Sequence, residues 1–179
     1  MKKEESIIIE IPEGIEFSVE GSRVKFSNGK EETEREFKAR EIRFEKKDGN
    51  LILNTKKYSR KTKSVMNAVR SHVMNLITGL KNGFEYKLMV VYSHFPINLA
   101  VKEGFLEINN FAGEKNPRKA TIVGKSTVEV KGKEVYVRGR IKEEVGQTAA
   151  NIETSTKVKG KDRRVFQDGI YRVSKMVKE

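Results

Sequence analysis

The stretch Val19-Glu20-Gly21-Ser22-Arg23-Val24-Lys25-Phe26 occurs in a second version further along the chain, Val101-Lys102-Glu103-Gly104-Phe105-Leu106-Glu107-Ile108. Each version follows a proline, Pro12 or Pro96, and the offset of about 84 residues has the size of a small domain. The repeat therefore predicts two tandem, duplicated domains. We place them at residues 1–83 and 84–179, with Gly83 as the junction and no long linker.

Both halves contain short segments in which apolar and polar residues alternate. Asn28-Gly29 and Asp48-Gly49 separate such segments, and this combination is typical of antiparallel hairpins. The expected strands are 7–11, 15–19, 23–26, 36–44 and 51–54 in the first half, and 85–95, 97–101, 105–108, 119–123, 128–131 and 135–138 in the second.

A segment with helical spacing follows the strands in each half. Residues 64–81 should form one helix, whose apolar face we assign to Val65, Val69, Val73, Leu76, Ile77 and Leu80. Residues 142–156 should form the other helix. Strands followed by one helix, twice, predict the fold class α+β, with an antiparallel-rich sheet covered on one face by a helix in each domain.

The charge of the chain is large and unevenly distributed. The 37 Lys and Arg exceed the 25 Asp and Glu, and from Leu51 to Phe84 there is no acidic residue at all. A cationic surface of this kind suits a phosphate polymer, and less well an anionic membrane, although a merely solvated face stays open. There is no cysteine, and no apolar run has the length of a secretory signal or a membrane span. We expect a cytoplasmic protein without a membrane partner.

Catalytic residues are scarce. His72 and His94 are the only histidines, no local motif supplies a nucleophile beside either, and Gly124-Lys125-Ser126 lacks the first glycine of a phosphate-binding loop. We expect no cofactor and no metal. The remaining catalytic alternative is a nuclease with paired acids, for which the candidates are Glu143, Glu144, Asp162 and Asp168.

Two basic segments in the second half are candidates for binding nucleic acid. One is the loop at residues 110–119, and the other is a C-terminal arm after the second helix. If they lie close together, they form a single clamp for phosphates. Phe166 and Tyr171 could stack on bases, but we favour a role in anchoring a terminal strand. The cations are Lys115, Arg118 and Lys119 in the loop, and Lys157, Lys159, Lys161, Arg163 and Arg164 in the arm.

Several stretches resemble the large-subunit ribosomal protein numbered six in the universal scheme, in its archaeal and eukaryotic branch. They are Ser93-His94-Phe95-Pro96, Asn110-Phe111-Ala112-Gly113-Glu114-Lys115, Val145-Gly146-Gln147-Thr148-Ala149-Ala150-Asn151-Ile152-Glu153 and Asp162-Arg163-Arg164-Val165-Phe166-Gln167-Asp168-Gly169-Ile170-Tyr171.

The resemblance implies two similar α+β domains and no catalysis. It also implies a place beside the sarcin–ricin loop of the large-subunit rRNA, where translational GTPases dock close to the stalk base and its ribosomal proteins. In that family the second domain makes most RNA contacts, which points to Lys115, Arg118, Lys119, Lys161, Arg163, Arg164 and Lys175 here. Lys157 and Lys159 are added by the charge argument alone. A free-standing binding protein for duplex DNA or a regulatory RNA remains an alternative.

Overall fold

The computed structural model describes residues 5–177 except 30, 40, 48, 56–58, 93–94 and 163, and it leaves the side chains of residues 5 and 175–177 undescribed. The chain divides into two compact units, Met1–Lys81 and Asn82–Glu179, which are called unit 1 and unit 2 below. Each has its own buried apolar core.

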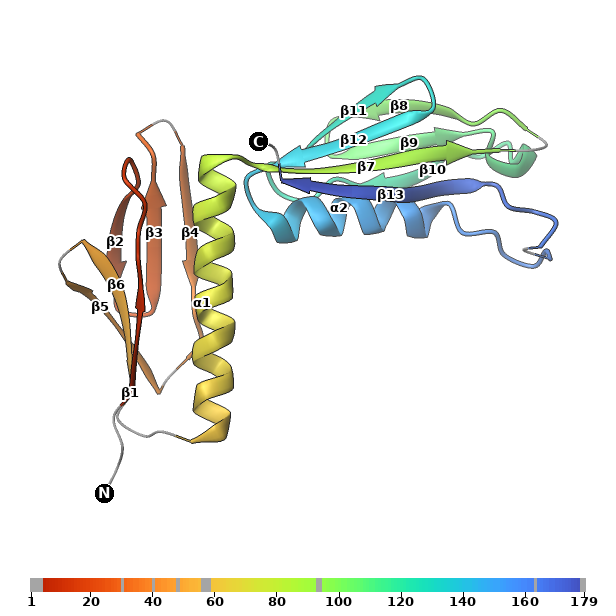
Figure 1. Cartoon of the computed structure of the whole chain (residues 1–179). Coiled ribbons are helices and arrows are strands. Elements are labelled where there is room, and N and C mark those ends of the chain that lie inside the picture. The colour runs from red at the N-terminus through yellow and green to blue at the C-terminus, as the bar shows by residue number, and fades with distance from the viewer. Residues whose placement is uncertain are drawn as a thin grey trace. The chain divides into compact units, whose positions relative to one another are not determined.

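Unit 1 consists of two small antiparallel sheets and one long helix, and the helix runs alongside the strands (Figure 1). In the first sheet, β6 (Asn50–Thr55) lies between β1 (Glu5–Ile9) and β5 (Ile42–Lys47). In the second, β3 (Arg23–Ser27) lies between β2 (Glu16–Glu20) and β4 (Glu32–Glu36). The helix α1 spans Arg60–Lys81.

Helix α1 begins four residues before the position expected from its apolar spacing. Ser59 explains the early start, because its hydroxyl accepts a hydrogen bond from the backbone N–H of Thr62 at 3.1 Å and so caps the first turn. The assignment of Val65 to the buried face is wrong, since Val65 is 38% exposed and Met66 is buried instead. The end at Lys81 is as expected, and Gly83 follows with a φ of 78°.

The single strand expected at residues 36–44 is wrong, because the chain passes there from one sheet to the other. β4 ends at Glu36 and β5 begins at Ile42. Between them the amide of Ala39 donates to the carbonyl of Phe37, and the amide of Ile42 donates to the carbonyl of Ala39. Phe37 and Phe44 are both buried, with ring centroids 5.5 Å apart, so the aromatic residues mark a corner in the core.

Unit 2 also contains two antiparallel sheets and one long helix. The three-stranded sheet has the order β10 (Arg118–Thr121), β9 (Phe105–Asn109), β8 (Asn98–Lys102). The four-stranded sheet has the order β11 (Thr127–Lys131), β12 (Glu134–Gly139), β7 (Phe84–Val91), β13 (Gly169–Val177). Helix α2 (Lys142–Ser155) lies against one side of the strands (Figure 1), and a short 3-10 turn, η1 (Phe111–Gly113), follows β9.

Helix α2 is joined to unit 2 through its apolar face and through one buried hydroxyl. Val145, Ala149 and Ile152 are buried, and the Thr148 hydroxyl accepts a hydrogen bond from the amide of Val123 at 2.9 Å. Helix and sheet approach each other closely at Gly139 on β12, where a Cβ would lie only 2.7 Å from Cγ2 of Val145. Helix α2 therefore has a structural role, as its sequence predicts.

The topology confirms the expected fold class and the duplication. The two copies of the repeated stretch form the hairpins β2–β3 and β8–β9, with Glu20 paired to Arg23 and Lys102 paired to Phe105. Each hairpin is extended by a third strand, β4 or β10, and β5-β6-β1 corresponds in order to β11-β12-β7. Unit 2 differs by the extra strand β13, which pairs with β7. No helix in the described ranges is long and apolar enough to span a bilayer.

Candidate RNA-binding site

The loop that follows β9 has a fixed shape. Asn110 and Ala112 adopt left-handed backbone conformations, with φ of 58° and 52°, which residues other than glycine rarely adopt. Phe111 between them is 1% exposed and anchors the loop in the core. The side-chain amide of Asn110 also donates to the carbonyl of Pro96 at 3.0 Å. The loop thus presents the exposed Lys115 from a rigid base.

Arg118 joins this loop to the end of α2. Its Nε and Nη2 donate to the two carboxylate oxygens of Glu114 at 2.8 and 2.5 Å. Its Nη1 donates to the carbonyls of Ser155 and Lys157 at 2.8 and 3.1 Å, which satisfies acceptors left open where α2 ends. The guanidinium lies 4.2 Å from the centroid of the Phe111 ring. Arg118 is therefore committed to internal contacts.

The arm that leaves α2 is basic and exposed. Lys157, Lys159 and Lys161 are all exposed, and Lys161 Nζ lies 4.7 Å from the centroid of the Phe166 ring. Hydrogen bonds from Arg118 lower the pKa of the Glu114 carboxyl, and the charge of Lys161 contributes in the same direction. The hydrogen bonds from Arg118 to the carbonyls of Ser155 and Lys157 place the start of the arm beside the loop.

Arg164 closes a turn at the far end of the arm. Its guanidinium donates to both oxygens of Asp162, at 2.9 to 3.3 Å, and its side chain is still 90% exposed. These hydrogen bonds lower the pKa of the Asp162 carboxyl, so the acid stays ionised beside the cation. We call the exposed cations on the two joined segments the basic surface: Lys115, Lys157, Lys159, Lys161 and Arg164.

Three other predicted site residues are not brought to the basic surface by the described structure. Lys119 follows Arg118 on β10 and so points to the other face of the sheet, where its Nζ lies 4.9 Å from the centroid of the Phe105 ring. Arg163 lies outside the described residues. Lys175 pairs with Tyr86 in β13, but its side chain is not described.

Several other cations of unit 2 pair with neighbouring acids. On the face of β7 and β12 away from α2, Lys87 pairs with Glu134 at 2.6 Å, and Arg138 pairs with Glu129 at 2.6 Å. The hydrogen bond from Lys131 lowers the pKa of Glu129. This face carries little net charge, so it attracts a polyanion less than the basic surface does.

Comparison with known proteins identifies the family. A family model described as Ribosomal protein L6 matches residues 95–169. The large ribosomal subunit protein uL6 of Archaeoglobus fulgidus is 46% identical over 96% of this chain and 90% of its own length. The uL6 of Methanobrevibacter smithii is 42% identical over 93% and 94%. The uL6 of Aeropyrum pernix is 45% identical over 91% and 90%.

The chain belongs to the ribosomal protein L6 family. It is therefore a structural, non-enzymatic component of the large ribosomal subunit. The resemblance noted in the sequence is confirmed across most of the chain.

The four acids of the nuclease alternative do not come together in this L6-family chain. Glu144 lies at the start of α2, where its carboxylate accepts a hydrogen bond from the amide of Lys125 at 3.0 Å. Asp162 and Asp168 follow the other end of α2, and a helix of 14 residues is about 20 Å long. Among the residues that the structure describes, no three acidic or histidine side chains are grouped as a metal site requires.

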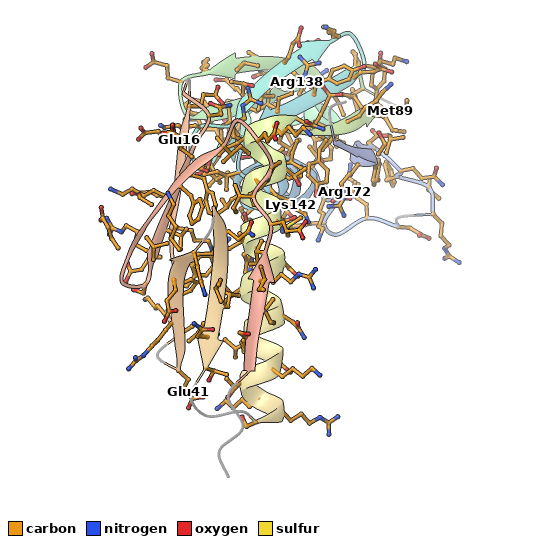
Figure 2. The ribbon with its side chains drawn as sticks, turned by 60° about the vertical axis from the view of Figure 1, so that its left-hand side comes forward. Glu16, Glu41, Met89, Arg138, Lys142 and Arg172 are labelled. Carbon is orange, nitrogen blue, oxygen red and sulfur yellow. The ribbon has the colours of Figure 1, made fainter. Side chains whose placement is uncertain are left out.

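The acid-free stretch of this L6-family chain supplies a separate set of cations, on α1 in unit 1. Arg60, Lys61, Lys63, Arg70 and Lys81 are all exposed. At roughly 100° per residue, Lys63, Arg70 and Lys81 fall within about 20° of one line along the helix. Figure 2 shows nitrogen-tipped side chains projecting from α1 away from the strands of unit 1. Lys56 and Lys57, from the same stretch, lie outside the described residues.

The contribution of Glu114 and of the end of α2 to the site was missed in the sequence. One signal was available, because Glu114 and Arg118 carry opposite charges four residues apart. The hydrogen bonds to Ser155 and Lys157 had no such signal, since these carbonyls are 37 and 39 residues away along the chain. Every residue has a backbone carbonyl, so the residue type does not indicate which carbonyl accepts a distant hydrogen bond.

Proposed function

We propose that the basic surface of unit 2 binds and positions large-subunit rRNA near the sarcin–ricin loop and the factor-binding site, and so supports translation. The observation that carries the proposal is the set of hydrogen bonds that Arg118 donates to Glu114, Ser155 and Lys157. These bonds hold the Lys115 loop and the Lys157–Arg164 arm together. Arginine and lysine side chains on the two segments then neutralise neighbouring phosphates. Lys119, Arg163 and Lys175 stay candidate contacts.

In this proposal the protein works in the cytoplasm, within the ribosome. Its partners are the rRNA, the neighbouring ribosomal proteins near the stalk base, and the translational GTPases that dock nearby. The role is mechanical and electrostatic: the chain neutralises phosphates and keeps an rRNA helix in place. Affinity for RNA therefore depends on salt, because each neutralised phosphate releases counterions.

The test is a binding measurement between the full chain and an rRNA fragment that contains the sarcin–ricin loop. If about five phosphates are neutralised, the log–log slope of affinity against salt should be roughly −3.5 to −4.5. Replacing Lys157, Lys159 and Lys161 with Gln should make the slope less negative by about 2 to 3. The matched control replaces Lys63, Arg70 and Lys81 on α1 and removes the same charge from unit 1.

The α1 variant should keep the slope of the unmodified chain. Equal effects of the two triple variants would show that net charge alone drives binding, and a flat salt response would contradict the proposal. Footprinting on intact large-subunit rRNA, with random duplex as competitor, separates a ribosomal role from general affinity for phosphate polymers.

A further inference from the structure

A pocket lies beside the basic surface, between the end of α2 and β13. It has a volume of about 140 Å³. Two of its walls are aromatic, Phe166 from the arm and Tyr171 from β13. The remaining lining residues are Glu153, Thr156, Lys157 and Val158. The expected anchoring role fits Tyr171 poorly, because its side chain is 44% exposed, whereas Ile170 beside it is fully buried.

The Tyr171 ring is held in place from two sides. Its hydroxyl donates to the carbonyl of Gln167 at 3.0 Å. The end of the ring lies close to Gly169, where a Cβ would come 3.0 Å from two ring atoms, Cε2 and Cζ, and 3.0 Å from the hydroxyl oxygen. A Cβ at this position would push the ring away by a few tenths of an ångström, so the glycine lets the ring lie close to the backbone. Such a fixed aromatic surface can stack on a ligand at little cost in conformational entropy.

The Thr156 wall is also held in place. The Thr156 hydroxyl accepts a hydrogen bond from the amide of Ile170 at 3.0 Å, which ties β13 to the end of α2. Phe166 carries Lys161 over its ring at 4.7 Å. The pocket thus combines two aromatic walls with cations at its rim, and unstacked RNA bases bind to this combination through stacking and phosphate contacts.

We propose that this pocket accepts one unstacked guanine base of the bound RNA. The inference rests on the proposed function, since it assumes that the basic surface holds the adjacent phosphates. Phe166 and Tyr171 supply the stacking faces. Glu153 selects the base: a carboxylate only accepts hydrogen bonds, and guanine presents N1–H and N2–H side by side on its Watson–Crick edge.

Seven-nucleotide single-stranded RNA probes test the proposal with the full chain. One probe has a central guanosine among uridines, the second has an abasic central site, and the third is all uridine. The guanosine probe should bind about 5- to 150-fold more tightly than the abasic one, the range that stacking of one base supplies. Tyr171→Leu and Phe166→Leu should each remove most of that difference while leaving the salt slope unchanged.

Three further variants sharpen the result. Tyr171→Phe keeps the ring and should keep most of the preference, which guards against a fold defect in Tyr171→Leu. Glu153→Gln should reduce the preference for guanosine over uridine. Tyr136→Leu is the matched control, because Tyr136 has Lys87 and Lys131 each 5.7 Å from its ring centroid but lies on β12, away from the pocket lining.

The outcomes separate the two proposals. Equal affinity for the guanosine and abasic probes, with a normal salt slope, would overturn the pocket and leave the phosphate-binding role intact. Absence of salt-dependent binding to these probes and to the rRNA fragment would overturn both.

Discussion

Arg118 shows how a single cation can order a basic surface through internal contacts. Four hydrogen bonds and a ring contact occupy its guanidinium, and only 23% of the side chain is exposed. Because these bonds connect the loop to the arm, the residue acts by positioning other cations. Loss of a positioning residue lowers stability, whereas loss of a phosphate contact changes the dependence of RNA affinity on salt.

We expect Arg118→Met to lower the free energy of unfolding by about 2 to 3 kcal/mol, since it leaves partly buried acceptors unsatisfied. RNA affinity should fall, but the salt slope should stay near that of the unmodified chain. Lys161→Met is the control: it should make the slope less negative by roughly 0.7 to 0.9 and change stability by less than about 0.5 kcal/mol. Urea unfolding and salt titrations measure both. A slope change in Arg118→Met with unchanged stability would make Arg118 a phosphate ligand.

The ion pair between Arg118 and Glu114 predicts a pH dependence. Hydrogen bonds from Arg118 lower the pKa of Glu114 below its usual 4.5. A lowered folded-state pKa stabilises the fold above the unfolded-state pKa, and this contribution is lost as the pH falls from about 4.5 through the folded-state pKa. Urea midpoints at pH 7 and below pH 4 should therefore differ less in Glu114→Gln than in the unmodified chain. An identical pH dependence in both would contradict this role.

The sequence shows which side chains are charged, but not which of them are engaged in contacts within the protein. Lys115, Lys157, Lys159 and Lys161 are exposed as a binding role requires. Arg118 and Lys119 are neighbours of the same sign, yet strand alternation directs them to opposite faces of β10. Recognising this needs the exact start of the strand, and the expected strand began one residue too late.

At the scale of elements, two side chains attach α2 to the turn before β11: the exposed Lys125 amide donates to Glu144, and the amide of Val123 donates to the buried Thr148 hydroxyl. Thr148→Val keeps the shape of the side chain but leaves the amide of Val123 without its acceptor. We expect a loss of about 1 to 3 kcal/mol in unfolding free energy. Thr127→Val is the matched control, because Thr127 is exposed and its hydroxyl donates over a longer 3.4 Å. It should change stability by less than about 0.5 kcal/mol. Equal losses in the two variants would contradict the role of Thr148.

The elements themselves are largely predictable where one period of alternation or helical spacing continues. Helix α2 was expected at residues 142–156 and spans Lys142–Ser155. Prediction failed at residues 36–44, because apolar residues continue through the corner between β4 and β5. Helix α1 began early because a serine cap, rather than an apolar residue, sets its start.

At the scale of the whole molecule, the two separate cores suggest that each unit responds to its own mutations. Leu53 in unit 1 and Leu88 in unit 2 are both fully buried. Truncating either to Ala should lower the free energy of unfolding of its own unit by about 2 to 5 kcal/mol. Native-state hydrogen exchange should show faster opening in unit 1 for Leu53→Ala and in unit 2 for Leu88→Ala. Faster exchange in both units of either variant would contradict independent folding and our junction at Gly83.

The duplication was predictable at this scale because the copies share turn positions and strand order. The sequence predicted a basic C-terminal arm and a terminal strand anchored by aromatic residues. It did not predict that this strand, β13, pairs with β7, because nothing in the sequence of β13 indicates its partner. Pairing between strands so far apart depends on the fold of everything between them.

The pairing of β7 with β13 also means that the sheet of unit 2 is completed late in the synthesis of the chain. β7 ends at Val91 and β13 begins at Gly169, so a nascent chain displays an open strand edge for most of the time in which unit 2 is made. Arg118 cannot make both of its hydrogen bonds to the end of α2 until Ser155 and Lys157 have been translated. The basic surface therefore takes its final shape only after nearly all of unit 2 has been made.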